Sequence, residues 1–228
     1  MLDITKILIM LRYTYISVLF FAFTAVCAQK AEEWQPTKGF TIGVNLVEPF
    51  TAIFNNERSG ASFLSRVSFK NDIYFFGEVG FENISFKKER YNYDSNGSFF
   101  KIGAEKDMLK KKDAGKNDNL LIGLKYGYAF QEQGVSNLFI TNGYWDDYYG
   151  RFRTYTVNSH WLELSFGPRM EMFKNFFVGW GFHIRATFYR NNPDIVDPYI
   201  IPGYGNGINK INGAFSFNVE YLIPWRGM

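Results

Sequence analysis

An alternating run close to the C-terminus constrains the fold of this chain more than any other feature. From Ile211 to Trp225 every second residue is apolar, aromatic or glycine, and the residues between them are mostly small or polar. Such alternation is typical of a β-strand, and this run is about twice the usual strand length of five to six residues. A lipid bilayer covers the whole apolar face of such a strand without a second layer of protein. The large side chains of that face are Phe215, Phe217, Val219, Tyr221, Ile223 and Trp225.

Seven further segments alternate in the same way. With the last strand they make about eight strands, an even number, as in single-chain bacterial membrane barrels. We therefore predict an all-β fold, a single antiparallel transmembrane β-barrel with long outer loops. No segment outside the N-terminus has a helical period, and Pro49 is expected to end the first strand or to make it bulge. The alternating segments span residues 40–46, 63–70, 73–82, 100–105, 120–131, 161–171 and 176–189.

The connections between the segments fall into two classes, as outer-membrane barrels require. Short or solvated turns belong on the periplasmic side of such a barrel, and long loops belong outside. With the N-terminal tail in the periplasm, the short class falls on the periplasmic side. The short class covers residues 71–72, 110–118 and 174–175, and the long class covers residues 87–97, 132–158 and 191–210.

The first residues have the features of a secretory signal peptide. Lys6 and Arg12 precede a short apolar run, and Val26-Cys27-Ala28 fits a cleavage site before Gln29. A lipoprotein signal with Cys27 as the lipidated residue is a rival interpretation, which Val26 disfavours because that position calls for a small residue. An uncleaved anchor is a further alternative, although the run is short for a span of about 20 residues.

We accordingly divide the chain into a signal peptide (residues 1–28), a periplasmic tail (29–38) and an outer-membrane barrel (39–228). Cleavage removes the only cysteine, which leaves no disulfide framework. The net charge of +3 comes without a sustained basic cluster, so nucleic acid is not an expected partner. An aromatic content of 20% instead suits a chain whose partner is outer-membrane lipid.

The polar face of the alternating segments is assigned to the lumen, against a soluble barrel with the reverse arrangement. This face collects many glycines, which suit the crowded interior of a narrow barrel, and an eight-stranded barrel is just wide enough for side chains to fill. We therefore expect a filled polar lumen without an open pore. Buried charges must be paired, so the charged residues of this face are predicted to form a structural network. These are Arg66, Glu78, Glu82, Lys101, Glu105, Lys125, Glu163, Arg169, Glu171, His183, Arg185 and Glu220.

Within this network we expect Arg169 to pair with Glu163 and Glu171, and His183 to be a hydrogen-bonded interior residue. A catalytic interpretation stays open for His183, and also for Ser159 with His160, because outer-membrane acyltransferases and deacylases use histidine with serine and an acid. No spacing signature supports it. Asp146-Asp147 and Asp194 with Asp197 match no calcium motif either. We therefore expect no catalytic residue, no metal site, no cofactor and no enzymatic activity.

The two longest outer loops carry far more apolar and aromatic residues than a solvated loop needs. A contiguous apolar patch of this kind indicates a protein partner. Alternatively, the two loops pack on each other and cap the mouth of the barrel, and a cap can itself be a docking surface. The candidate partner residues are Leu138, Phe139, Tyr144, Trp145, Tyr148, Tyr149, Ile195, Tyr199, Ile200 and Ile201.

With these features the chain resembles the small outer-membrane β-barrels common in Bacteroidota. The resemblance rests on Gln29 after the cleavage site, on strands such as Gly179-Trp-Gly-Phe182 and on the ending Val219–Trp225. It covers essentially the whole mature chain and carries over no catalytic residue. It implies a non-enzymatic accessory subunit beside a larger outer-membrane complex for assembly, secretion or uptake. The alternative function is a lipid- or ligand-active barrel that uses Ser159 and His160 or the His183 site.

Overall fold

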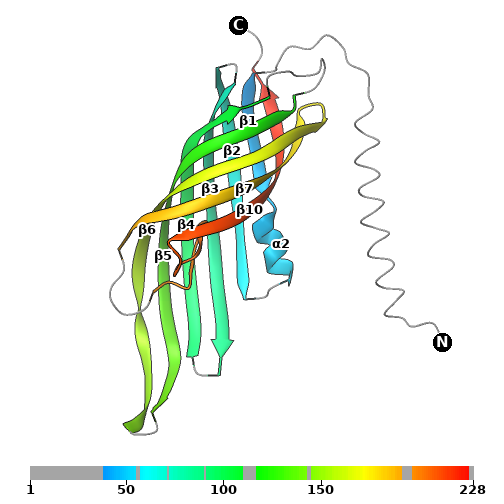
Figure 1. Ribbon diagram of the computed structural model, residues 1–228. Helices are drawn as coiled ribbons and strands as arrows, with labels where there is room; N and C mark the ends of the chain where they lie inside the picture. Colours follow the sequence, from blue (N-terminus) through cyan, green and yellow to red (C-terminus); the bar gives the residue numbers. More distant parts are fainter. Residues whose placement is uncertain are drawn as a thin grey trace, which may run out of the picture. The chain divides into compact units, whose positions relative to one another are not determined.

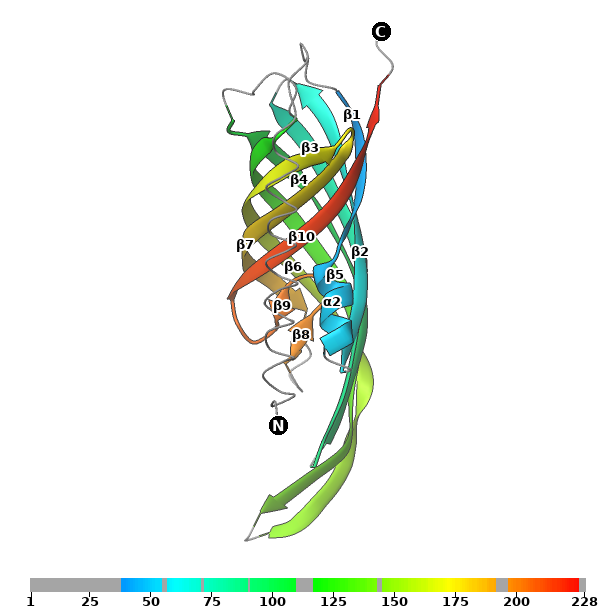
Figure 2. The same cartoon turned by 90° about the vertical axis from the view of Figure 1, so that its right-hand side faces the viewer.

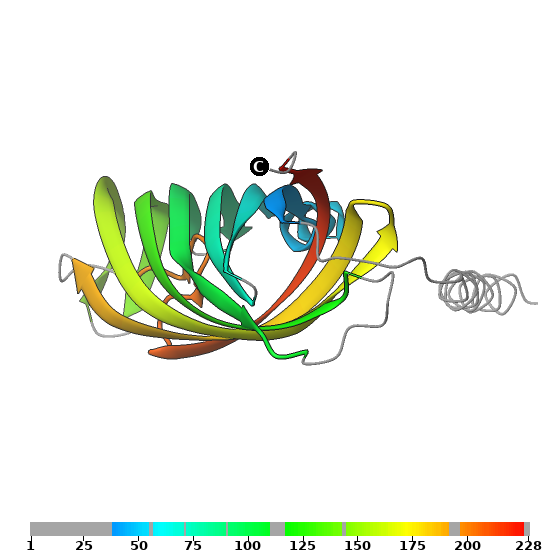
Figure 3. The same cartoon turned by 90° about the horizontal axis from the view of Figure 1, so that it is seen from above.

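The computed structural model describes residues 38–54, 57–70, 72–89, 91–109, 117–142, 145–191 and 197–225. Eight antiparallel strands close into a barrel in the order β1-β10-β7-β6-β5-β4-β3-β2, as predicted (Figures 1 and 3). The proposed signal peptide and all but the last residue of the proposed tail lie outside the described residues. The barrel strands are β1 (Gly39–Asn45), β2 (Arg58–Lys70), β3 (Ile73–Lys88), β4 (Tyr91–Asp107), β5 (Asn119–Asn142), β6 (Trp145–Phe173), β7 (Phe176–Asn191) and β10 (Ile211–Pro224).

The first and last strands close the ring. β1 pairs with β10 from Gly39↔Pro224 to Asn45↔Asn218, and the Trp225 amide donates to the Lys38 carbonyl at 3.0 Å. The barrel end at which β1 begins and β10 ends is called the terminal end here, and the opposite end is called the far end. The connections from β2 to β3 and from β6 to β7 lie at the terminal end, the second through the turn at Lys174 and Asn175 (Figure 1).

Side chains alternate between the two faces of the sheet as the sequence predicts. The apolar face of β10 points outward: Phe215 is 45% exposed, Tyr221 49% and Ile223 47%. Large apolar side chains of every other barrel strand are exposed in the same way, for example Phe63 on β2 and Leu164 on β6. The outer surface of the barrel is therefore a continuous apolar belt, and the polar residues of each strand face the interior.

The strands on one side of the barrel continue beyond it at the far end. Residues 83–88, 91–97, 131–142 and 145–158 of β3, β4, β5 and β6 form this extension, which we call the wall (Figure 2). The prediction of loops at residues 87–97 and 132–158 was therefore wrong. These segments read as loops because they are rich in Gly, Asn and charged residues, yet they complete ladder pairing with neighbouring strands.

A short helix, α2 (Val47–Phe54), follows β1 at the far end, where only a strand end was expected. Asn45 caps it: Asn45 Oδ1 accepts from the Val47 amide at 3.1 Å, and Asn45 Nδ2 donates to Glu48 Oε1 at 3.2 Å. Pro49 lies in the first turn, where its missing N–H has no helical acceptor to lose. The prediction that no helix exists outside the N-terminal segment was therefore wrong. None of the described helices is long and apolar enough to cross a membrane.

A small hairpin made of β8 (Ile200–Ile201) and β9 (Gly205–Asn206) lies between β7 and β10 in the chain. Its turn contains Gly203 at φ 68°, a conformation that favours glycine. Ile201 and Tyr204 are almost completely buried, at 0% and 1% exposure. Residues 197–206, which we call the cap, are thus packed into the far mouth of the barrel.

Candidate functional site

The structure places the twelve charged residues of the predicted lumen network on the inner face of the barrel. Eleven of them are buried, and Glu171 is half-buried. They come from seven of the eight strands. The remaining strand, β1, contributes Thr41, whose hydroxyl accepts a hydrogen bond from Arg169 at 3.3 Å. The interior of the barrel is therefore a connected set of polar side chains that joins every strand.

Glu163 on β6 is the residue on which this network converges. Its carboxylate is fully buried. One oxygen lies 2.8 Å from His183 Nδ1, and the other accepts a hydrogen bond from Arg185 Nε at 2.8 Å. Lys101 Nζ lies 3.5 Å from it and Lys125 Nζ lies 3.9 Å from it. Lys101 also contacts Glu78 Oε2 at 3.1 Å. One carboxylate thus compensates groups on β4, β5 and β7, which satisfies the requirement that a buried charge be paired.

A second group of ion pairs fills the lumen toward the terminal end. Glu105 contacts Lys125 Nζ at 2.9 Å and Arg66 Nε at 2.6 Å. Arg66 also pairs with Glu220, whose other oxygen accepts from Arg169 Nε at 2.8 Å. The cations lie against aromatic rings as well, with Lys125 Nζ 3.7 Å from the Phe76 ring centroid.

The expected pairing of Arg169 with Glu163 and Glu171 was wrong. Arg169 pairs with Glu220 and donates to Asn119 Oδ1 at 2.9 Å. Glu171 instead accepts from Asn117 Nδ2 at 2.7 Å and from the Asn175 amide at 2.8 Å, so it holds two turns at the terminal end. Strands tilt and shift around a barrel, so residues that are close in one strand meet different partners across the lumen.

His183 forms the centre of an arrangement that sequence reasoning did not assemble. Its Nδ1 meets Glu163 and its Nε2 lies 2.8 Å from Ser216 Oγ on β10. The order serine, histidine and acid is that of a hydrolytic triad. However, Ser216 and His183 adjoin a cavity of only about 30 Å³, which has room for about one or two water molecules. Glu163 is also held by three cations, so the geometry favours a structural role.

Ser159 and His160 do not form a pair. Successive side chains of a strand point to opposite faces of the sheet. Ser159 is buried on the inner face, whereas His160 lies on the outer face with its Nδ1 2.6 Å from the Tyr126 hydroxyl. The interpretation of these two residues as a joint catalytic site is therefore excluded by the geometry. Among the described residues, no three His, Cys, Asp or Glu side chains are grouped in a way that holds a metal ion.

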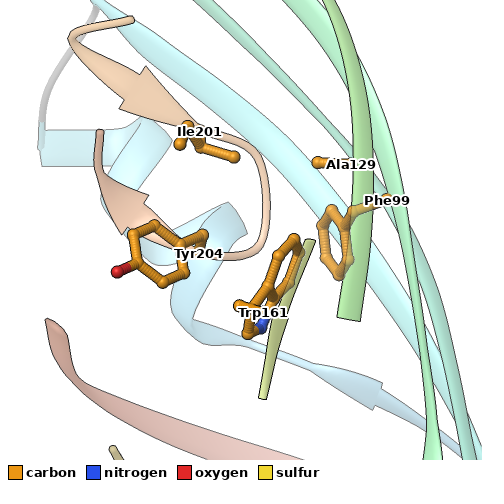
Figure 4. Packing of buried hydrophobic residues seen from close by; sticks show 5 residues of the cluster. All are labelled: Phe99, Ala129, Trp161, Ile201 and Tyr204. Atoms are coloured by element: carbon orange, nitrogen blue, oxygen red, sulfur yellow. The ribbon is translucent and has the colours of Figure 1, made fainter. Parts of the chain in front are cut away.

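An apolar layer separates the charged lumen from the far end. Phe99, Ala129, Trp161, Ile201 and Tyr204 form it, and the last two come from the cap (Figure 4). The rings of Trp161 and Tyr204 lie 5.6 Å apart. Trp161 lies over Gly127, where a Cβ atom would come within 2.1 Å of the indole. The sequence placed Gly127 in the lumen but gave no sign of this pairing, because the two residues are far apart in the chain.

Polar contacts hold the cap in place. Arg185, which binds Glu163 in the lumen, also donates to the Tyr204 carbonyl at 3.1 Å. The Tyr204 hydroxyl donates to the carbonyl of Lys210 at 2.8 Å, and Gln131 Nε2 donates to the carbonyl of Ile200 at 3.2 Å. The mouth of the barrel is therefore closed by a segment that the lumen network itself fixes.

The candidate partner residues divide between the cap and the wall. Ile201 is buried in the cap, and Tyr199, 50% exposed, packs edge-on against Phe86 with 5.4 Å between the ring centroids. Leu138 and Ile200 pack against a second buried cluster on the inner face of the wall. Phe139 lies in β5, paired with Tyr149. Tyr144 and Ile195 lie outside the described residues, as do the side chains of Trp145, Tyr148 and Tyr149.

The wall ends in a ribbon of two strands. Pairing of β5 with β4 ends at Ser136↔Asn92, so residues 137–142 of β5 pair only with residues 145–150 of β6 in the described chain. We call these two segments the tip ribbon. Asn137, at φ 52°, marks a bulge at its base, where the register of β5 and β6 shifts. Figures 1 and 2 show the ribbon projecting beyond all other strands.

Residues 6–226 match the model of the family described as "Domain of unknown function (DUF6048)", so the chain belongs to this family. No curated protein matches it. Among solved structures it is similar to Ail, the attachment invasion locus protein of Yersinia pestis, at 9% identity and a TM-score of 0.41, over 83% of this chain and 99% of that chain.

It is also similar to a major outer membrane protein from Thermus thermophilus, at 10% identity and a TM-score of 0.47, over 81% of this chain and 98% of that chain. Both are barrels of the outer-membrane type. Identities this low carry no function from either protein to this chain.

Proposed function

We propose that this member of the DUF6048 family is an integral outer-membrane barrel that acts as a non-enzymatic accessory subunit of a larger outer-membrane complex for assembly, secretion or uptake. In this proposal a signal peptide directs export, the terminal end faces the periplasm and the wall faces outward. The apolar belt supports membrane insertion, because lipid can cover apolar side chains exposed on every strand. The ion pairs and the cap leave the interior little free space, which points to a role carried by surfaces.

The single observation that carries the docking role is the tip ribbon. An isolated two-stranded hairpin is marginally stable in water unless further structure covers it. The sequence of the ribbon is rich in aromatic and aliphatic residues, which suits the buried centre of a protein interface. Residues 145–157 of β6 also have no strand on their second edge among the described residues, since pairing with β7 begins at Asn158. Such an edge offers main-chain donors and acceptors to a partner strand.

Affinity purification from outer membranes in mild detergent, followed by mass spectrometry, tests the docking role. We expect the full chain to retain a large outer-membrane protein in stoichiometric amount. The matched control replaces residues 137–150 by Asn-Gly, which joins Ser136 to Arg151 through a two-residue hairpin turn. This variant should fold but lose the partner. If it keeps the partner, docking runs through the lipid face of the barrel, and a lone full-length monomer would contradict the accessory role.

A second candidate function is catalysis on a lipid or another ligand, carried out by the line of hydrogen-bonded residues Glu163, His183 and Ser216. Ser216→Ala removes the only hydroxyl that this line presents as a nucleophile, and His183→Ala removes the base. If the barrel is an enzyme of this kind, both variants lose turnover of outer-membrane lipid. The accessory role requires instead that Ser216→Ala and His160→Ala still retain the partner, since His160 lies on the opposite face of the sheet from this line.

A further inference from the structure

A cluster of aromatic side chains surrounds His160 on the outer face of the barrel. Tyr128 lies beside it with 4.9 Å between ring centroids, and Tyr189 meets it edge-on at 5.3 Å. Phe188 lies at 6.2 Å from the imidazole and Tyr126 at 6.1 Å. Histidine is unusual on a surface whose other large members are Phe, Tyr, Leu and Ile. Its place there calls for a partner for its polar atoms.

A bulge builds this cluster. His160 pairs with Tyr189 but Trp161 pairs with Thr187, so Phe188 is an extra residue in β7. The extra residue brings two consecutive side chains, Phe188 and Tyr189, to the outer surface, at 61% and 55% exposure. Bulges commonly re-aim side chains in this way near binding sites.

The hydrogen bond at His160 Nδ1 determines whether His160 Nε2 carries a proton and can act as a donor. The Tyr126 hydroxyl lies 2.6 Å from His160 Nδ1, and we assign the hydroxyl as donor and Nδ1 as acceptor. A neutral imidazole then carries its proton on Nε2. In the described part of the chain this Nε2–H has no acceptor. The cluster thus presents one directed donor, framed by rings, to whatever lies outside the barrel.

The position of His160 along the barrel indicates which molecule meets this donor. On the terminal side the outward residues of the same strand are Leu162 and Leu164, which are 48% and 52% exposed. On the far side they are Asn158 and Thr156, and Glu132 pairs with Thr156. His160 therefore lies where the apolar belt gives way to polar residues, the level at which acyl chains join the polar part of a lipid.

We propose that this cluster binds the acyl carbonyl of an outer-leaflet lipid, with His160 Nε2–H as donor to the ester or amide oxygen. Tyr128, Phe188 and Tyr189 would then flank the first carbons of the acyl chain. A neutral carbonyl fits better than a phosphate because the described side chains that surround His160 include no cation. Arg190, next in the chain, donates to the Gly207 carbonyl and pairs with Asp197 instead. The site rests on the proposed insertion of the barrel into the membrane.

Solid-state NMR on the full chain in lipid nanodiscs tests the site. The protein carries ¹⁵N-histidine, and the phospholipid carries ¹³C at its acyl carbonyls. We expect a protonated His160 Nε2 that transfers magnetisation to the lipid carbonyl carbon. The only other histidine, His183, is an internal control, because it is buried in the lumen and should show no transfer. A second set of discs also contains lipopolysaccharide. The lipid whose acyl carbonyls give the stronger signal from His160, phospholipid or lipopolysaccharide, is the preferred ligand.

His160→Phe keeps a ring in the cluster and removes the donor. Its purified form should retain about fivefold less bound lipid by native mass spectrometry, since one neutral hydrogen bond is lost. Unchanged retention, or no transfer from wild-type His160, would overturn the site. Labelled Leu164 separates this result from failure of membrane insertion: contacts of Leu164 with acyl carbons show an inserted barrel without the His160 site, and their absence contradicts insertion itself.

Discussion

Glu163 illustrates how this barrel keeps charges in its interior. Four basic groups from three strands converge on one fully buried carboxylate. Removing one partner of a buried ion pair costs more than the pair contributes, because the remaining charges stay desolvated without compensation. The same rule applies to each shared carboxylate of the lumen, of which Glu105 and Glu220 are further examples.

Glu163→Gln should therefore lower the free energy of unfolding by about 3–5 kcal/mol. Urea-induced unfolding of the purified protein in detergent, followed by the loss of β-sheet circular dichroism, measures this change. Glu132→Gln is the matched control, since Glu132 is exposed on the outer face of the wall. Equal stability of both variants would contradict the view that the lumen charges act as one network.

Gly127 and Trp161 form a pair in which a missing side chain makes room for a large one. Gly127→Ala would place a Cβ within 2.1 Å of the indole, so we expect a loss of about 1–3 kcal/mol from overpacking. A second substitution, Trp161→Phe, should restore part of that loss in the double variant. Gly213→Ala is the control, because nothing lies within 4 Å of a Cβ there. Thermal unfolding of the wild type, Gly127→Ala, the double variant and Gly213→Ala measures these losses. Equal losses of stability in Gly127→Ala and Gly213→Ala would contradict the predicted overpacking.

At the scale of elements, α2 is held at the mouth of the barrel through a residue whose burial is costly. Burial and the nearby carboxylate of Glu78 raise the pKa of Glu48 above its usual value of 4.5. Asn45 and Ser62 donate to its carboxylate, the latter at 3.4 Å. The folded chain therefore binds the proton of Glu48 more tightly than the unfolded chain does.

This shift sets the sign of a pH dependence. Because the folded pKa is raised, the free energy of opening of α2 is largest at low pH and falls as pH rises from about 4.5 through the raised pKa. Hydrogen exchange of the α2 amides, corrected for the intrinsic rate, should show this loss of protection. Glu48→Gln should remove the dependence, whereas Glu89→Gln, on an exposed turn, should leave it. Protection that grows with pH in the wild type would contradict the assignment.

The strands were largely predictable because each has one apolar face and one polar face. The alternation located all eight strands and most of their inward residues, from Thr41 to Glu220; Tyr189, expected inside, faces outward because of the bulge at Phe188. Their far ends were not predictable, since beyond Phe130 the outward residues turn polar and the segment no longer alternates. The helix α2 is too short for a period, and Pro49 within it argued for a strand end. The partners of Arg169 depend on tilt and register, which sequence alone does not supply.

At the scale of the whole molecule, the alternation gives the barrel an apolar outer surface and a closed polar interior. The outward residues form the apolar belt, the inward residues form the network, and the longer strands β3 to β6 carry the wall beyond the barrel. The wall, the cap and α2 lie at the far end of the barrel in the described chain. The proposed partner and the proposed lipid therefore meet different parts of the surface, the tip ribbon and the His160 cluster.

The central claim is that this barrel works through its surfaces while its interior stays closed. Planar-bilayer recording of the purified full chain tests that claim most directly, with an open porin in the same lipid as positive control. We expect no steady conductance above the bare bilayer, because paired charges occupy the lumen and the cap closes its far mouth. A steady unitary conductance from the folded wild-type protein would contradict the claim and would assign the function to the lumen.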